Sequence, residues 1–411
     1  MNRRVVVTGL GTVSPVGNTV DEAWLALLDG RSGAAPITKF DASNLKVRFA
    51  CEIKDFDAQA YISRKEARRY DNFVQYAIAA AQQAVDQSGL NAGFPDPNRT
   101  GVIIGSGIGG MQTYEDNCRA YITEGPDRVS PFFVPMFISD MAAGLVSIRF
   151  GLKGPNFCTV SACASSANAI GESFDLIRRG AADAMIAGGS EAAITGLTVT
   201  AFANMKALSF RNDDPATASR PFDKERDGFV LADGGAIVVL ESLEHAEARG
   251  ATVLGEVIGY GLSGDAYHIT SPPPGGEGAA QAIRDCLADG NIDQADVGYI
   301  NAHGTSTPVG DVAETRAVKS VFGDHARDLI FGSTKSMTGH LLGGAGAFEF
   351  IVSLLVVTRG KIPPTINQFT PDPDCDLDSA AGAMVERDVK VALSNSFGFG
   401  GHNVTLAVRG P

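Results

Sequence analysis

The sequence is poor in cysteine, and its cysteines are not paired. Six are scattered over 411 residues without a CxxC pair or a regular spacing. This scatter argues against a zinc knuckle and against the disulfide framework of a small secreted domain. We therefore expect free thiols in a reducing cytosol.

Positive charge is also scarce. The chain has 34 Lys and Arg against 47 Asp and Glu, which gives a formal net charge of −13. A summed field of that sign disfavours nonspecific attraction to nucleic acid or to anionic lipid. We expect no nucleic-acid partner, and an acidic partner must find a local basic patch.

Long apolar runs are missing as well. The most apolar stretch, residues 341–357, is slightly short for a bilayer and carries Glu349 in its middle, which favours a central buried helix over a membrane span. The N-terminus runs from two arginines into an apolar strand, without the features of a leader peptide. We predict a soluble, cytoplasmic protein with no membrane association.

The glycine-rich stretches do not match nucleotide-binding patterns. Residues 9–17 lack both GxGxxG and the GK[ST] of a P-loop, and residues 105–110 lack the acidic ribose residue in a clear βαβ context. We predict no nucleotide and no other cofactor.

Short apolar runs alternate with helical patterns along the whole chain. Residues 70–88 carry an apolar stripe of helical period, and Gly89 is a plausible stop. This alternation predicts a layered α/β protein. Runs rich in Val, Ile and aromatics that end at Gly, Ser or Asn predict buried strands at 3–11, 100–107, 182–190, 235–242, 251–261, 297–304, 328–333 and 391–399.

Two segments look like copies of one unit. One begins at Cys163 and ends in RRG, and the other follows His340 and ends in TRG. Both place glycine and alanine on the inward face of a predicted helix, which would let the two helices approach closely. A duplication that divides near residue 250 explains this pattern, and so does coincidence between two Gly/Ala-rich buried helices.

Cys163 lies among small residues at the predicted start of a helix. Unpaired backbone N–H groups and partial positive charge at such a position favour thiolate over thiol and can bind an oxyanion. A thiolate there can take an acyl group from a thioester in a nearly isoenergetic step. The alternative is a small, packed structural residue.

Two of the six histidines lie where a predicted loop meets a buried element. His303 follows a strand, where open α/β sheets place their sites, and His340 precedes a buried helix, five residues after Lys335. Either could instead be structural. Cys163 and these two could bind zinc, but they are far apart in sequence and no nearby carboxylate or second cysteine completes a set, so we predict no metal.

Other polar residues have simpler structural interpretations. Asp311 and Glu314 match the capping box of a helix N-terminus. Glu349 needs a partner if it is buried as a charge, and Lys335 is a candidate. Residues 396–403, SFGFGGHN, predict a mobile loop whose backbone approaches something closely.

Four motifs now resemble those of the β-ketoacyl-acyl-carrier-protein synthases, the condensing enzymes of fatty-acid synthesis. They are TVSACASS, NAHGTSTPVGD, STKSMTGHLLGGAGAFE and NSFGFGGHN, in the family's order over the whole chain. GSGIGG, with Ile108, looks closest to the type II elongating synthases. The resemblance implies a homodimer with a thiolase-like five-layer αβαβα fold, built from two βαβαβαβ halves. Here these would be 1–250, with the nucleophile and cap insertions, and 251–411, with the catalytic histidines.

The resemblance also implies a role for each catalytic residue. Cys163 would take the growing acyl chain from the phosphopantetheine of an acyl carrier protein. His303 and His340 would promote decarboxylation of malonyl-carrier protein by hydrogen bonding to the thioester oxygen. Lys335, paired with Glu349, would orient His340.

Further positions carry over from the family in the same way. Phe399 would act as a gate, and its backbone N–H would join that of Cys163 in an oxyanion hole. Pantetheine would contact Thr305, Thr307, Thr270 and Ser271. The acyl pocket would be walled by Ile108, Phe133 and Phe202. The carrier protein would dock on Lys65, Arg68, Arg69 and Lys206, for which a solvated helix face is the alternative.

One residue departs from the family pattern, and several functions share the fold. Many relatives have threonine in place of His402, which leaves the local role of this third imidazole open. A thiolase or a coenzyme A-dependent initiating synthase would replace one histidine, and a chain-length factor would lack Cys163. The remaining alternative to a 3-oxoacyl-carrier-protein synthase is a ketosynthase of a specialised polyketide or polyene pathway.

Overall fold

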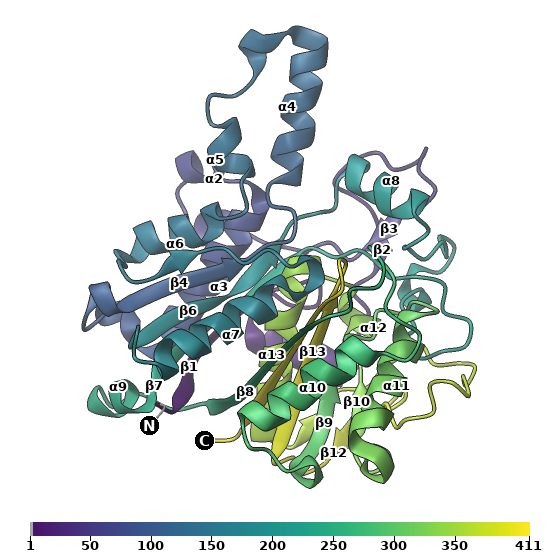
Figure 1. The fold of residues 1–411 in the computed structure, drawn as a ribbon. Helices are drawn as coiled ribbons and strands as arrows, with labels where there is room; N and C mark the ends of the chain where they lie inside the picture. The colour runs from purple at the N-terminus through teal and green to yellow at the C-terminus, as the bar shows by residue number, and fades with distance from the viewer. Residues whose placement is uncertain (1–2) are drawn as a thin grey trace.

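The apolar strands form one ten-stranded mixed sheet in the computed structural model, which describes residues 3–411 (Figure 1). Each of the eight predicted strand segments overlaps a strand of this sheet. The sequence pattern missed the last long strand, β14. In chain order the sheet contains β1 (Val5–Val13), β4 (Thr100–Gly105), β5 (Asn156–Phe157), β6 (Ala184–Glu191), β7 (Gly234–Ser242), β8 (Gly255–Gly264), β9 (Val297–Asn301), β10 (Ile330–Gly332), β13 (Val391–Gly398) and β14 (His402–Arg409).

Two five-strand arrangements with the same topology make up this sheet. Their orders are β1-β7-β6-β4-β5 and β8-β14-β13-β9-β10. In each, the first three strands pair antiparallel and the last three pair parallel. β1 and β8 pair antiparallel and join the halves. The shared connectivity shows a duplication and not a coincidence, and we propose that the halves divide near residue 250, before β8.

Helices cover the sheet on its outer faces and fill the space between the halves (Figure 1). α3 packs on β1, β7 and β6, α10 packs on β8 and β14, and α7 and α13 contact each other in the middle layer. The helices are α1 (Val20–Leu28), α2 (Arg64–Ala67), α3 (Asn72–Ser88), α4 (Met111–Glu124), α5 (Phe133–Phe137), α6 (Met141–Phe150), α7 (Ser165–Arg178), α8 (Gly196–Asn204), α9 (Leu243–Ala248), α10 (Glu277–Asp289), α11 (Gly310–Phe322), α12 (Lys335–Thr338) and α13 (Ala345–Arg359).

The predicted helix at 70–88 is α3, and its ends follow from its caps. The Asp71 side chain accepts a hydrogen bond from the N–H of Phe73, so the helix starts at residue 72. Gly89 ends it in the left-handed region, with φ of 77°. Two short ribbons lie outside the main sheet: β2 (Ala35–Pro36) with β3 (Phe49–Ala50), and β11 (Lys361–Ile362) with β12 (Val385–Glu386).

α13 is the central helix of the fold. With the turn before it, Leu342–Arg359 is long and apolar enough to cross a membrane, but 83% of these residues are buried inside the protein. The apolar surface of α13 therefore packs against neighbouring layers of the protein. This agrees with the central buried helix that Glu349 predicts in the sequence.

Small residues let α7 and α13 approach each other closely. A Cβ atom on Gly346 would lie 2.9 Å from the Cβ of Ala167 and 2.7 Å from the Oγ of Ser396. A Cβ on Gly171 would lie 2.2 Å from the ring of Tyr260. Gly346 is therefore needed for the α7–α13 crossing, and Gly171 is needed for the packing of α7 against Tyr260 of β8.

The segment predicted as a mobile loop, 396–403, is instead a β-hairpin. β13 and β14 pair from Val391 opposite Arg409 to Gly398 opposite His402. The turn passes through Gly400 and Gly401, which have φ of 87° and 77°. Glycine in this motif therefore serves a tight turn.

Both ends of the chain are fixed to one carboxylate. Arg4 in the N-terminal segment and Arg409 at the end of β14 each form an ion pair of 2.7 Å with Glu256 on β8. The two ends lie close together in Figure 1.

We predict that Gly346→Ala lowers the free energy of unfolding by about 1–3 kcal/mol, because the added methyl group overpacks the α7–α13 contact. Chemical denaturation measures the change. The matched control is Gly144→Ala in α6, where a Cβ atom meets nothing within 4 Å and the helix gains up to about 1 kcal/mol. Equal stability of the two variants would contradict the close contact.

Candidate active site

Cys163 lies in a tight turn just before α7. The turn is a 3-10 segment, Ala162–Ala164, and Ala162 has φ of 50° in the left-handed region. The second half repeats this turn before α13, in Leu342–Gly344, where Leu342 has φ of 46°. The counterpart of Cys163 is therefore Gly343 and not His340, which corrects the predicted match between the two helix heads.

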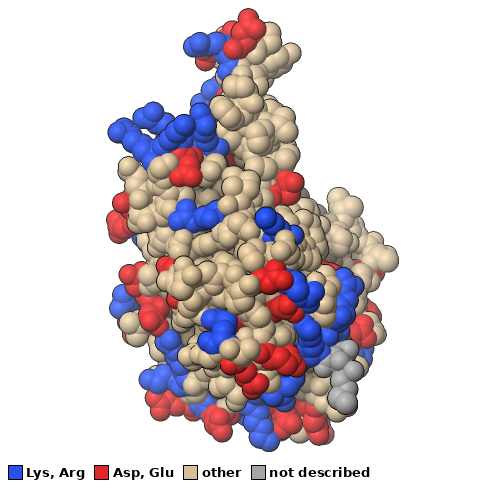
Figure 2. Space-filling view, turned by 90° about the vertical axis from the view of Figure 1, so that its left-hand side faces the viewer, with Lys and Arg blue, Asp and Glu red and all other residues tan. Residues whose placement is uncertain are grey.

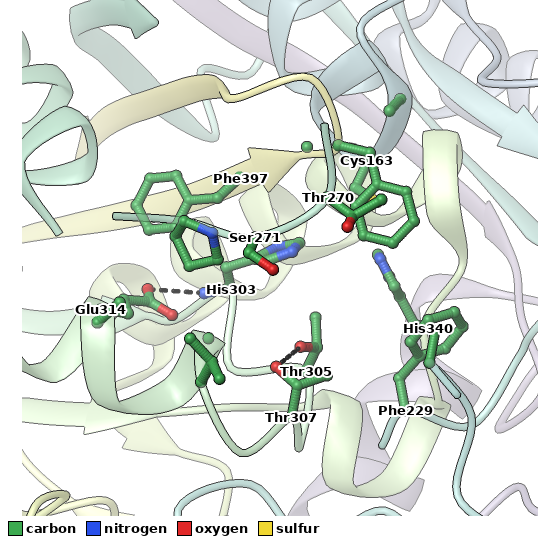
Figure 3. A pocket seen from close by; sticks show the side chains of 18 of the residues that line it. Cys163, Phe229, Thr270, Ser271, His303, Thr305, Thr307, Glu314, His340 and Phe397 are labelled. Atoms are coloured by element: carbon green, nitrogen blue, oxygen red, sulfur yellow. Dashed lines mark hydrogen bonds between the residues drawn. The ribbon is translucent and has the colours of Figure 1, made fainter. Parts of the chain in front are cut away.

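The thiol and two imidazoles meet in one place, although 140 residues separate Cys163 from His303 along the sequence. The Cys163 sulfur and one nitrogen from each ring of His303 and His340 all lie within 4.8 Å of one another. The centroids of the two rings are 5.3 Å apart and their planes are nearly perpendicular, at 83°. Figure 3 shows these side chains around a common cavity.

Both imidazoles are held in their neutral form. Burial lowers the pKa of His303 and of His340 well below 6.5, and the positive charge of Lys335 lowers both further. Within residues 3–411, neither Nδ1 atom has a hydrogen-bond partner. The site therefore offers uncharged rings at neutral pH.

Burial outweighs the predicted activation of the Cys163 thiol by its helix terminus. Burial raises the pKa of this thiol to about 12. The charge of Lys335 and the backbone N–H groups of Phe399 and Cys163 favour the thiolate but do not outweigh burial. The thiol therefore keeps its proton, and a neutral imidazole within 4.8 Å is placed to accept it when the sulfur attacks.

The predicted capping box at Asp311 and Glu314 is also wrong. No side chain caps α11 among the residues described. Glu314 instead accepts hydrogen bonds from the backbone N–H groups of His303 at 2.9 Å and Gly304 at 2.8 Å, and from the Asn395 side chain at 3.1 Å. It therefore fixes the backbone that carries His303 (Figure 3).

Asp311 supports the neighbouring loop. Its carboxylate accepts from the N–H of Phe222 at 2.9 Å and lies 3.5 Å from Arg226. Burial raises the pKa of Asp311 to about 6, against the charge of Arg226. The pair holds the segment between β9 and α11, because Arg226 also donates to the carbonyl oxygens of Thr307 and Pro308.

Lys335 and Glu349 form a fully buried ion pair beside the two rings. Burial raises the pKa of Glu349 to about 7, and the charge of Lys335 opposes that shift. Among the described residues, no hydrogen bond joins Lys335 to His340. Its demonstrated effect on the imidazoles is electrostatic.

A cavity of about 460 Å³ contains the thiol and both rings. The hydroxyls of Thr305 and Thr307 are 3.1 Å apart in its wall. Phe399 lines it from the turn of the hairpin. The other proposed binding residues that line it are Ile108, Phe202, Lys206, Thr270 and Ser271, together with the carboxylate-bearing Asp311 and Glu314.

Some predicted residues lie elsewhere in the described chain. Phe133 is outside the cavity and stacks on Phe137 at 5.7 Å between ring centroids. Lys65, Arg68 and Arg69 are exposed on and after α2, a helix of only four residues. These residues are therefore surface features of one chain and not part of its cavity.

Several lining residues were missed in the sequence, among them Phe229, Phe397 and Glu191. Phe229 packs edge-on against His340 at 5.3 Å, and Phe397 lies 5.8 Å from His303. Phe397 lies within the SFGFGGHN segment that the sequence singles out, whereas nothing marks Phe229 among the other apolar residues. Glu191 carries a signal that could have been used, since it is an acidic residue at the carboxyl end of an otherwise apolar strand.

The cluster of one sulfur and two imidazoles could also hold a metal ion. Folding brings the three donors together, so their separation in the sequence does not exclude zinc. A site with three donors would leave a fourth position open.

Together, the duplicated fold and a cysteine facing two neutral histidines define a condensing enzyme of the thiolase fold. The chain belongs to the beta-ketoacyl synthase family. Models of that family's N-terminal and C-terminal domains match residues 2–246 and 254–369. The chain is accordingly an acyltransferase.

Relatives named 3-oxoacyl-[acyl-carrier-protein] synthase 2 match over nearly the full length. One from Synechocystis sp. is 54% identical over 407 residues, which cover 99% of this chain and 98% of the relative. One from Staphylococcus aureus (strain COL) is 52% identical over 408 residues, with the same coverage.

Solved structures share the fold. The ishigamide ketosynthase/chain length factor has a TM-score of 0.94 at 35% identity, and a beta-ketoacyl synthase from Burkholderia phymatum has 0.92 at 36%. A type II PKS acyl-carrier protein in complex with its ketosynthase has 0.92 at 35%. Each match covers 100% of both chains.

We predict that the rate of malonyl decarboxylation stays level as the pH falls through 6.5 to about 5.5, because the lowered pKa values keep His303 and His340 neutral there. Carbon dioxide release from malonyl-carrier protein measures the rate. Circular dichroism at each pH checks that the protein stays folded. A fall of about fivefold between pH 6.5 and pH 5.5 would mean that an imidazole titrates near its ordinary pKa.

Proposed function

We propose that this condensing enzyme extends fatty acyl chains by two carbons, with Cys163 as the nucleophile. The sulfur attacks the thioester of an acyl carrier protein, and its proton passes to the carrier's leaving thiolate through a neutral imidazole. Malonyl-carrier protein then binds, loses carbon dioxide and gives a carbanion. That carbanion attacks the acyl-Cys163 thioester, and the sulfur is released as the new carbon–carbon bond forms.

The observation that carries this proposal is the cluster of Cys163, His303 and His340 within 4.8 Å. Decarboxylation places negative charge on the malonyl thioester oxygen. Neutral imidazoles in a buried cavity can donate hydrogen bonds to that oxygen without adding a competing charge, and such donors typically contribute a few kcal/mol. The charge of Lys335, paired with Glu349, helps to keep both rings neutral.

The remaining cavity residues suit a carrier-bound substrate. The backbone N–H groups of Phe399 and Cys163 favour charge at the sulfur, so they can also stabilise the oxyanion of the tetrahedral intermediate. Pantetheine would contact the wall formed by Thr305, Thr307, Thr270 and Ser271. Ile108 and Phe202 would bound the acyl chain.

The carrier protein would dock on an exposed basic patch. Figure 2 shows basic side chains gathered near the base of the projecting α4–α5 segment. Lys65, Arg68 and Arg69 are exposed there, and the Arg69 guanidinium lies 4.8 Å from the ring centroid of Phe132. Lys206 is exposed at the cavity. Basic groups at these positions would attract an acidic carrier despite the net charge of −13.

We infer a homodimer from apolar side chains that one chain leaves exposed, and we propose a cytoplasmic location because all six cysteines are free. Phe132 and Val134, beside Phe133, are 42% and 59% exposed on the projecting segment, and Phe157 on the edge strand β5 is 41% exposed. Exposed apolar groups on an unpaired edge fit pairing with a second copy. Such pairing would explain why Phe133 lies outside its own chain's cavity.

A ketosynthase of a specialised polyketide or polyene pathway remains the second candidate. The solved structures named for such systems support it at 35% identity. Relatives named 3-oxoacyl-[acyl-carrier-protein] synthase 2 are more similar, at 52–54% over nearly the whole chain, and they favour the first proposal.

We predict that Cys163→Ala abolishes condensation, because no other thiol lines the cavity among the described residues. Formation of 3-oxoacyl product measures the loss, and the melting temperature should stay near that of the parent protein. Cys158→Ala, a half-buried cysteine outside the cavity, is the control and should retain activity. Parental activity in Cys163→Ala would refute the nucleophile.

We predict that charge reversal to Glu at Lys65, Arg68 and Arg69 raises KM for acyl-carrier protein about tenfold or more, while acyl-pantetheine thioesters react as before. The two substrates separate docking from chemistry. The control reverses the same number of exposed charges in the other half, at Arg284, Arg327 and Lys390. Equal losses with both substrates would argue against the docking patch.

A further inference from the structure

Glu191 is a buried carboxylate in the cavity wall with no role in the steps above. It ends β6, is 0% exposed, and lies opposite Gly234 of β7. Within residues 3–411 it forms no ion pair with Lys, Arg or His, and its partners are neutral. A carboxylate buried without a cation is costly unless hydrogen bonds satisfy it fully.

Those hydrogen bonds join two separate segments of the cavity. One carboxylate oxygen accepts from the Ser106 hydroxyl at 2.9 Å and the Ile108 N–H at 3.2 Å. The other oxygen accepts from the Gly107 N–H at 2.7 Å and the Gly343 N–H at 3.0 Å. Glu191 therefore links the Ile108 segment of the first half to the turn that follows His340 in the second.

The backbone is shaped to permit this contact. A Cβ atom on Gly107 would lie 2.9 Å from the second carboxylate oxygen, and one on Gly343 would lie 2.6 Å from it. Glycine at both positions therefore lets the N–H groups reach the carboxylate. Burial raises the pKa of Glu191 to about 7, and the four donors oppose that shift.

We propose that Glu191 is a positioning residue that sets the preferred acyl chain length by holding the Ile108 segment against the pocket. This rests on the proposed function, in which Ile108 bounds the acyl chain. A longer chain that shifts the backbone of the Ile108 segment must pull its N–H groups away from a buried carboxylate, and hydrogen bonds to a charged acceptor are roughly twice as strong as neutral ones. The binding of long acyl chains therefore costs free energy that the binding of short chains does not.

The shared oxygen adds a link to the catalytic turn. Gly107 and Gly343 donate to the same atom, so a shift of the Ile108 segment changes the support of the turn that follows His340. The carboxylate also lies near enough to Cys163 for its charge to raise the pKa of that thiol. A long acyl chain that shifts the Ile108 segment would therefore alter contacts close to Cys163 and His340.

The test compares Glu191→Gln and Ser106→Ala with the parent enzyme. The amide introduced by Glu191→Gln keeps one acceptor oxygen and turns its NH2 group towards N–H donors, which loosens the segment. We expect the ratio of kcat/KM for long-chain over medium-chain acyl-carrier protein to rise about tenfold in Glu191→Gln. Ser106→Ala removes a single donor, so the ratio should rise in the same direction by about threefold.

Glu241→Gln is the matched control. Glu241 is equally buried at the opposite end of the same strand pair, facing Ala184, and it is bound by Arg249 and His245 outside the cavity. Replacement of this carboxylate by an amide should lower the melting temperature. It should leave the ratio of kcat/KM for long-chain over medium-chain acyl-carrier protein unchanged.

One outcome would overturn the proposal. If the ratio is unchanged or falls in both Glu191→Gln and Ser106→Ala, Glu191 does not set chain length. If Glu191→Gln does not fold, the direction of the ratio in Ser106→Ala decides alone. Labelled acyl transfer to Cys163 in the parent enzyme is measured in parallel, so that failure of the proposed function is recognised separately.

Discussion

The close contact between α7 and α13 is the constraint on which the site depends. Gly346 packs directly on Ala167, and a turn with one left-handed residue precedes each helix. The first turn carries Cys163, and the second follows His340. Any increase in the separation of the helices would move the sulfur away from the rings, so packing at the centre of the molecule sets the catalytic geometry.

The buried charged residues around the cavity fall into two groups, according to the groups that they contact. Lys335 is paired with Glu349 and acts on the imidazoles through its field, so both rings stay neutral. Glu314 and Glu191 instead bind backbone N–H groups, the first below His303 and the second below Ile108. Each half thus uses a buried carboxylate to fix the loop that follows the middle strand of its parallel set, which is β4 in the first half and β9 in the second. Hydrogen bonds to these loops offset the free energy cost of burying each carboxylate.

Sequence patterns predicted the strands and the duplicated helices because period and composition report burial directly. The sequence also pointed to Cys163, His303 and His340 one at a time, from local context at element ends. It could not give the ionisation of the thiol, because that depends on burial in the folded chain and on groups distant in sequence, such as the charge of Lys335 and the backbone N–H of Phe399. The capping box at Asp311 failed for the same reason, since partners from other segments outcompete the local N–H groups.

The pairing of both chain ends with Glu256 has a consequence for connectivity. Arg4 and Arg409 bind the same carboxylate, so a short linker could close the chain into a ring with little loss of loop entropy. New ends opened in the connection before β8 would then place the second half ahead of the first. Because β1 and β8 pair where the two halves of the sheet meet, such a permuted chain would form the same sheet. The final structure therefore does not fix the order in which the two halves are synthesised.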